Sequence, residues 1–156
     1  MLEIVLPGRD NLILHHLVCD VNGTLALDGQ LIPGVANLLH HLQSSLSIHL
    51  VTANTFNRQA EIDAALGTTA ILLEPDLEAE QKAAVVRDLG VEVTAAIGQG
   101  ANDQLMLQEA ALGICVLSTE GTFTPTLLAS DLVFPNIVAA LECFNHPTRI
   151  TATLRR

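Results

Sequence analysis

The sequence predicts an α/β fold, a doubly wound sheet of parallel strands with helices on both faces. Short apolar runs alternate with amphipathic stretches over all 156 residues, which is typical of this class. Several of the apolar runs stop abruptly in polar residues, as strands do at the functional edge of an open parallel sheet. With 49% hydrophobic residues the chain can also bury a substantial core. No repeat or linker divides the chain, so we expect one domain over residues 1–156.

Apolar runs place the strands. We expect them at residues 2–6, 12–20, 47–51, 69–73, 91–97, 113–117 and 130–134. Between residues 25 and 32, short alternating segments flank Asp28-Gly29, a strong turn sequence. This pattern predicts a small β-hairpin flap beside the end of the 12–20 strand.

Amphipathic spacing and end signals place the helices. We expect them at residues 34–43, 56–66, 76–89, 102–111 and 136–144, with a short one capped by Thr124 or Thr126. Gly67 and Gly90 follow two of them as stop signals, and Asp76 stands where an N-cap is expected. We expect the arginine-containing C-terminal tail to be a docking or frayed end.

Composition excludes several classes of function. The net charge of −10 disfavours nucleic acid and anionic membrane as partners, and the apolar runs are too short to span a membrane. Three widely spaced cysteines suit a reducing cytoplasm and neither a zinc site nor a disulfide framework. The first residues do not form a signal peptide. We therefore expect a cytoplasmic protein, for which a small phosphorylated substrate remains open.

Polar residues at strand ends predict the site. Asp20 follows one buried strand and Thr52 follows the next, while Lys82 lies in a helix. Gln99 and Asn102-Asp103 follow a later strand. Since neighbouring parallel strands end on one edge of the sheet, these residues could converge although they are far apart in sequence.

Simpler interpretations of the same residues exist. Asn22-Gly23 between apolar runs is also typical of a two-residue hairpin turn, with Asp20 as its polar flank. Lys82 could lie on a solvated helix face, paired with Glu78 four residues earlier. Taken one at a time, these residues leave both alternatives open.

Together these polar residues have the side chains that phosphoryl transfer needs. A carboxylate can take up a phosphoryl group as an aspartyl-phosphate. A hydroxyl and an ammonium can hold phosphoryl oxygens and stabilise their charge. A second acidic group helps to hold Mg²⁺, which prefers oxygen ligands and keeps several waters.

At this point the sequence resembles a family. Asp20-Val21-Asn22-Gly23-Thr24-Leu25, Thr52, Lys82 and Gly98-Gln99-Gly100-Ala101-Asn102-Asp103 look like the four motifs of the haloacid-dehalogenase-like (HAD) superfamily. The branch that the chain most resembles is the soluble P-type-ATPase-like phosphatases, which resemble the phosphorylation domain of ion pumps without its membrane part. The resemblance covers almost the whole chain and implies a Rossmann-like core. Its first and fourth motifs are specific, and they displace the hairpin interpretation of Asn22-Gly23.

The resemblance also implies roles for single residues. Asp20 would be the nucleophile and a Mg²⁺ ligand, and the backbone carbonyl of Asn22 a second ligand. Thr52 and Lys82 would bind the phosphoryl group, and Asp103 would support the metal site. The full expected set is as follows: catalytic Asp20, Asn22, Thr52 and Lys82; substrate-binding Thr52, Ala53, Lys82 and Asn102; metal-binding Asp20, Asn22, Gln99 and Asp103.

Two positions depart from the phosphatase pattern. The family's phosphatases usually carry a second Asp where this chain has Asn22, and an amide cannot provide general acid–base help, worth about 10²–10⁴-fold. Gln99 replaces an Asp that usually binds Mg²⁺, so metal binding should weaken, unless Asp103 compensates. Both departures predict slow turnover.

The segments between the motifs are too short for a cap domain, so we expect an open, capless site. Either the substrate is large, such as a phosphoprotein, or a second copy of the chain closes the site in a homo-oligomer. The sequence thus predicts a slow, Mg²⁺-dependent phosphatase acting through Asp20. The alternatives are a phosphate-binding or regulatory module that has lost hydrolysis, favoured by Asn22 and Gln99, and an oligomeric scaffold.

Overall fold

A six-stranded parallel sheet forms the centre of the computed structural model, which describes residues 1–53 and 58–156. The strand order is β10-β9-β8-β3-β6-β7, and every neighbouring pair is parallel. The strands are β3 (His16–Asp20), β6 (Ser47–Thr52), β7 (Ile71–Leu72), β8 (Thr94–Gly98), β9 (Leu112–Val116) and β10 (Leu132–Phe134). The expected doubly wound α/β class is confirmed.

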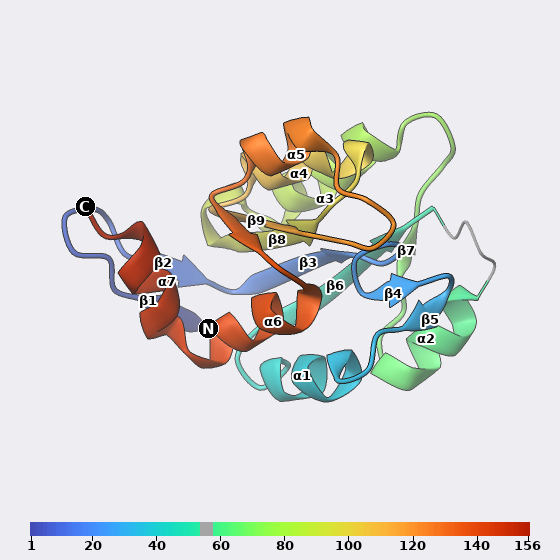
Figure 1. Ribbon diagram of the computed structural model, residues 1–156, viewed down its shortest axis with the longest axis horizontal. Coiled ribbons are helices and arrows are strands. Elements are labelled where there is room, and N and C mark those ends of the chain that lie inside the picture. The colour runs from blue at the N-terminus through green and yellow to red at the C-terminus, as the bar shows by residue number, and fades with distance from the viewer. Residues whose placement is uncertain (54–57) are drawn as a thin grey trace.

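Helices cover both faces of this sheet (Figure 1). On one face lie α3 (Glu78–Leu89), α4 (Gln104–Glu109) and α5 (Thr124–Ala129). On the other lie α1 (Val35–Leu42), α2 (Gln59–Leu66) and α6 (Ile137–Asn145). None of the helices within the described ranges has the length and apolar character needed to cross a membrane.

Alternation along β3 explains the two layers. Leu17 and Cys19 are buried in the larger apolar cluster, with residues of α1, α2 and α6. Val18, between them, is buried in the smaller cluster, with residues of α3 and α4. Because successive strand side chains point to opposite faces, a strand with three successive apolar residues is suited to the middle of a two-sided core.

Two antiparallel hairpins stand outside the central sheet. β1 (Leu2–Ile4) pairs with β2 (Leu12–Leu14), and β4 (Ala26–Leu27) pairs with β5 (Gln30–Leu31). The second hairpin turns at Asp28-Gly29 and is the expected flap. It is the element that the chain forms between β3 and α1, a connection too short for a cap domain.

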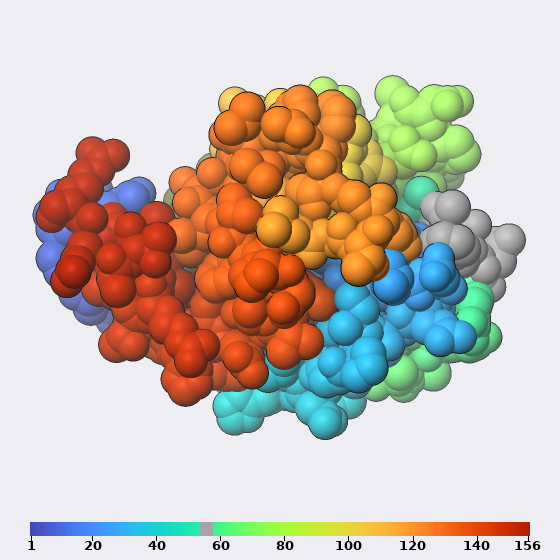
Figure 2. All heavy atoms as spheres, in the orientation of Figure 1, coloured from blue at the N-terminus to red at the C-terminus, as the bar shows by residue number. Residues whose placement is uncertain are grey.

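The C-terminal tail forms a helix, α7 (Pro147–Leu154), that packs beside the N-terminal hairpin. Ile150 is buried, and the Thr151 hydroxyl donates a hydrogen bond to the Val5 carbonyl at 2.8 Å. Figure 2 shows this C-terminal segment lying against the N-terminal residues at one end of the molecule. Of the two expected forms of this end, the structure shows a docked helix and not a frayed tail.

Several expected boundaries were wrong. The strand expected at 12–20 breaks at His15, which separates β2 from β3. Val91–Val93 forms a 3₁₀ turn before β8, and Asp76 has a positive φ instead of capping α3. Neither threonine caps α5, since its N-cap is Phe123. The expected start of the 56–66 helix lies outside the described residues.

The strand order locates the functional edge. The chain runs from β3 outward through β6 and β7, and then returns to the other side of β3 to form β8, β9 and β10. The carboxyl end of β3 therefore lies at the point where the strand order reverses, which is where open α/β sheets bind ligands.

Candidate active site

Asp20 is the last residue of β3 and is only 6% exposed. Its Oδ1 accepts a hydrogen bond from Lys82 Nζ at 2.7 Å, and its Oδ2 accepts one from the Thr24 hydroxyl at 2.9 Å. The following turn brings Thr24 back toward Asp20, since the amides of Leu25 and Ala26 both donate to the Val21 carbonyl. The Asp20 carboxylate is thus held in a fixed orientation.

Gly23 makes this turn possible. Its φ is +80°, a backbone conformation that side-chain-bearing residues rarely adopt, and its N–H donates to the Ala26 carbonyl at 2.7 Å. A Cβ here would collide with the amide of Gln99 and stand 2.8 Å from Glu120 Oε2. The turn after Asp20 and two loops from later strands therefore pack together around a residue without a side chain.

Lys82 comes from the second turn of α3 and is 1% exposed. Its ammonium donates to Asp20 at 2.7 Å, to Asp103 Oδ1 at 2.6 Å and to the Asn102 side-chain oxygen at 3.2 Å. The interpretation of Lys82 as a solvated partner of Glu78 is wrong. A buried ammonium needs such partners, because an unpaired charge in the interior is very costly.

Two buried carboxylates share this one ammonium. Burial, and next the charge of Asp103, raise the pKa of Asp20 to about 7, against the opposing effects of Lys82 and Thr24. Burial acts to lower the pKa of Lys82, but the charges and hydrogen bonds of Asp20 and Asp103 together raise it. Lys82 therefore stays charged. Because two carboxylates share this single ammonium, a further positive charge near Asp20 would be stabilised.

Asp103 is fully buried and organises the loop after β8. Its Oδ2 accepts hydrogen bonds from the backbone amides of Gln99 and Gly100, both at 2.8 Å. Gly98 permits this approach, since a Cβ there would lie 2.5 Å from Asp103 Cγ. In this arrangement both Asp103 oxygens have protein donors, so the residue shapes the loop after β8 and positions Lys82.

Asn22 and Thr52 meet above Asp20. The Asn22 side-chain amide donates to the Thr52 hydroxyl at 3.1 Å, and Thr52 is the fully buried last residue of β6. The amide at position 22 is thereby directed toward the hydroxyl expected to bind a phosphoryl oxygen. Asn22 can donate or accept a hydrogen bond there, but it cannot transfer a proton.

These residues enclose a pocket of about 250 Å³. The described residues that line it are Asp20, Asn22, Ala53, Lys82, Gln99, Asn102 and Glu120. The expected residues absent from this lining, Thr52 and Asp103, contact it indirectly through Asn22 and Lys82. The structure thus brings together all eight residues expected from sequence.

Two members of the site were missed from sequence. Thr24 lies four residues after Asp20 and was quoted only as part of a motif. Glu120 follows β9, and a polar residue after a strand is the same indication that pointed to Asp20 and Thr52. Sequence alone does not single out Glu120, because a loop separates it from the end of β9.

The donors available to a metal ion are oxygens. Within residues 1–53 and 58–156, no cluster of three or more His, Cys, Asp or Glu side chains is arranged to hold a metal. The pocket nevertheless offers the carboxylates of Asp20 and Glu120 and the amide of Gln99. Mg²⁺ is usually bound by one or two carboxylates plus waters and substrate phosphate, so this donor set fits Mg²⁺ better than zinc.

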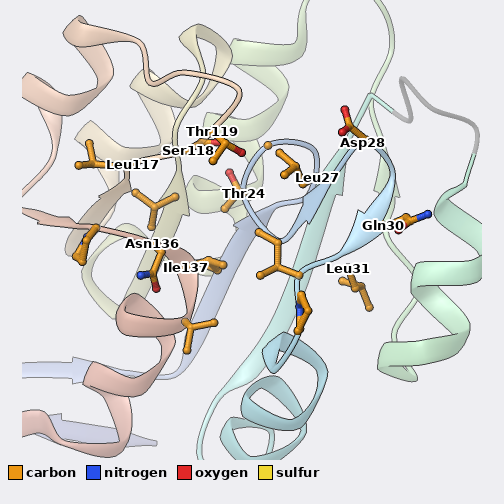
Figure 3. Close-up of a pocket in the computed structure, with 16 residues that line it drawn as sticks. Thr24, Leu27, Asp28, Gln30, Leu31, Leu117, Ser118, Thr119, Asn136 and Ile137 are labelled. Carbon is orange, nitrogen blue, oxygen red and sulfur yellow. The ribbon is translucent and has the colours of Figure 1, made fainter.

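A second, larger cavity adjoins the site. It has a volume of about 780 Å³ and lies between the flap, the loop after β9 and the start of α6 (Figure 3). Thr24, which binds Asp20, forms part of its wall, and Leu31, Leu117 and Ile137 contribute apolar surface. Such a cavity has the size of a small-molecule site.

Comparison with known proteins begins with sequence. No family model matches the chain. The uncharacterized protein MJ0073 of Methanocaldococcus jannaschii is 47% identical over 60 residues, which are 38% of this chain and 64% of that protein. The chain thus matches less than two thirds of this relative's length.

Solved structures are similar over most of the chain. The 3-deoxy-D-manno-octulosonate 8-phosphate phosphatase of Moraxella catarrhalis, in complex with magnesium, phosphate and KDO, has a TM-score of 0.67 at 20% identity, covering 89% of this chain and 90% of that one. A phospho-aspartyl intermediate analogue of phosphoserine phosphatase has a TM-score of 0.64 at 13% identity, covering 86% and 99%.

A membrane pump is similar over part of its length. A zinc-transporting PIB-type ATPase in its E2.Pi state has a TM-score of 0.60 at 22% identity, covering 80% of this chain and 20% of the pump. Identities this low establish the fold and leave the activity to be argued from the site. The chain has the Rossmann-like fold of the HAD phosphatases.

Proposed function

We propose that the chain is a Mg²⁺-dependent phosphatase that acts through an aspartyl-phosphate on Asp20. The observation that carries the proposal is the buried Asp20 carboxylate, oriented by Thr24 and Lys82 at the mouth of a polar pocket. The phosphatases of the same fold support it, since one binds magnesium and phosphate and another was captured as a phospho-aspartyl analogue.

In the first step an Asp20 oxygen attacks the phosphorus of a phosphate monoester. The bond from phosphorus to the ester oxygen breaks, and that oxygen leaves with a proton from solvent. Lys82 and Thr52 bind the phosphoryl oxygens, and their fixed donors stabilise the charge that develops there. A bound Mg²⁺ would neutralise further charge on the same oxygens.

In the second step water attacks the phosphorus and the bond to Asp20 breaks. Phosphate and the free carboxylate result, and the proton of the attacking water passes to solvent. Since Asn22 cannot accept that proton, we propose that this step is slow and that the phosphoenzyme persists. The likeness to the pump supports the further proposal that the chain belongs to a P-type-ATPase-like branch.

The cavity beside Thr24 suggests a substrate class. Its apolar walls are suited to the organic part of a small phosphate ester whose phosphoryl group lies against Asp20. An aryl ester such as p-nitrophenyl phosphate is therefore the appropriate first probe. Closure of the open site by a second copy of the chain, or its use on a phosphoprotein, stays a prediction.

The test replaces the nucleophile. We expect Asp20→Asn to abolish Mg²⁺-dependent release of p-nitrophenol and of inorganic phosphate, because an amide cannot form the phosphoenzyme. Asp88→Asn, which removes the same charge from the exposed face of α3, should keep the rate of the unchanged chain. Full Mg²⁺-dependent release by Asp20→Asn would overturn the mechanism.

A second candidate is a module that binds phosphate without hydrolysis. Asn22 and Gln99 favour it, because each lacks the charge or proton that the phosphatases of this fold usually place there. Binding of beryllofluoride, a phosphoryl analogue, without phosphate release from a panel of esters would select this alternative.

A further inference from the structure

Glu120 is placed where the site lacks a charge. It lies in the loop between β9 and α5, and its carboxylate lines the same 250 Å³ pocket as Asp20 and Gln99. Its Oε2 and the Gln99 amide both lie against Gly23, as the collision of a Cβ at that residue shows. The amide that replaces an expected metal-binding Asp therefore has a carboxylate beside it.

The loop holds Glu120 in this position from two sides. Its Oε1 accepts a hydrogen bond at 3.3 Å from the backbone amide of Asp28 in the flap, and its own N–H donates to the Ser118 hydroxyl. At the end of the loop, the Phe123 N–H donates to the Gln99 carbonyl at 2.9 Å. This bond ties the loop of Glu120 directly to the backbone of Gln99.

The distribution of carboxylates in the pocket also favours Glu120 as a metal ligand. Asp103 is fully buried, and both of its oxygens accept hydrogen bonds from the protein, so it is poorly placed to replace the missing ligand. Among the described residues lining the pocket, the carboxylates are those of Asp20 and Glu120. Mg²⁺ is usually bound by one or two carboxylates together with several retained waters and substrate phosphate, so a second carboxylate completes the common set.

From these contacts, and resting on the proposed function, we propose that Glu120 supplies the second carboxylate of the divalent-cation site, in place of the charge that Gln99 lacks. Glu120 acts there directly or through one retained water, with Gln99 contributing its amide oxygen. The cation site then spans the ends of three neighbouring strands, β3, β8 and β9.

The test measures metal binding without substrate. Mn²⁺ alone is titrated into the full chain, and free Mn²⁺ is followed by electron paramagnetic resonance. We expect Glu120→Gln to weaken binding about tenfold, the lower end of the effect seen for residues that tune metal sites. Glu92→Gln, an exposed glutamate in the 3₁₀ turn before β8, loses the same charge and should stay within about twofold of the unchanged chain.

A compensating variant completes the design. If Glu120 replaces the charge missing at position 99, Gln99→Asp combined with Glu120→Gln should restore Mn²⁺ affinity. Equal affinity of Glu120→Gln and the unchanged chain would overturn the inference, as would absence of Mn²⁺ binding by the unchanged chain. Because no turnover is measured, a chain that binds Mn²⁺ through Glu120 but forms no aspartyl-phosphate on Asp20 would reject the phosphatase proposal alone.

Discussion

In the proposed reaction, Asn22 is the residue that limits the rate. Its amide donates to the Thr52 hydroxyl at 3.1 Å, so the side chain already points to the group that we propose binds a phosphoryl oxygen. An aspartate has the same shape and could accept a hydrogen bond from that hydroxyl. The substitution would replace the amide donor by a charged group that can carry a proton.

We therefore expect Asn22→Asp to raise the turnover of p-nitrophenyl phosphate by about 10²-fold, because a general acid–base group would then serve both steps. The pH profile of kcat should also gain a limb in the acidic range. Asn22→Ser, which adds no titrating group, provides the control. An unchanged rate in Asn22→Asp would show that proton transfer does not limit the reaction.

At this scale the sequence predicted the members of the site but not all of their partners. Asp20 and Thr52 could be found because each ends a buried strand. The burial of Lys82 could not, because lysine is rarely buried and its position on α3 also suits a solvated face. Glu120 was missed because its place depends on how a loop folds back onto Gln99.

At the scale of elements, the central strands carry a histidine pair. His16 of β3 and His49 of β6 lie on neighbouring strands, and their ring nitrogens are 3.1 Å apart. Burial lowers the pKa of both imidazoles, and each also feels a neighbouring histidine, His15 for His16 and His16 for His49. Protonating either ring would place positive charge beside another imidazole.

The lowered pKa values of the two histidines make the stability of the fold depend on pH. With pKa values below the ordinary 6.5, the folded chain binds fewer protons than the unfolded chain just below that pH, so stability is lost as the pH falls. The raised pKa of Asp20 acts in the opposite direction over the same pH range, so the expected result is a difference between two chains. When the pH is lowered from 7.5 to 5.5, the urea midpoint of the unchanged chain should fall relative to that of His49→Gln.

His40→Gln is the matched control, because His40 is exposed on α1 and should leave the pH dependence as it is. Equal changes of the urea midpoint with pH in His49→Gln and the unchanged chain would show that the histidine pair does not couple folding to protons.

Element types were easier to predict than element ends. Alternating apolar and amphipathic stretches identified every strand of the central sheet. The break at His15 and the 3₁₀ turn at Val91–Val93 were hidden, because neither contains a Gly or Pro and the residues around them are largely apolar. The His15 N–H donates to the Val93 carbonyl at 2.8 Å, so each irregularity satisfies the other, and such a tertiary contact leaves no local pattern.

At the scale of the whole molecule, the two ends of the chain are joined. Ile150 of α7 is 1% exposed and belongs to the same apolar cluster as Ile4 and Leu14 of the N-terminal hairpin. The Arg156 amide also donates to the Pro7 carbonyl at 3.3 Å. The hairpin lies outside the central sheet and depends on this packing.

We therefore expect Ile150→Ala to lower the free energy of unfolding by about 2–4 kcal/mol, through lost burial and an unfilled cavity. Urea denaturation followed by circular dichroism measures it. Ile13→Ala in β2 is the control, since Ile13 is 44% exposed, and we expect its cost to be below about 1 kcal/mol. Similar costs for both would mean that α7 does not stabilise the fold.

The tight turn at Gly23 also bears on how the protein ages. Asn-Gly pairs deamidate when the glycine nitrogen attacks the preceding amide through a cyclic imide. Here that nitrogen is engaged with the Ala26 carbonyl at 2.7 Å, and the amide itself is held by Thr52. The native fold thus shields Asn22 from a reaction that unfolded chains undergo freely. In protein recovered from denaturant, deamidation could convert Asn22 to the aspartate that the gene does not encode.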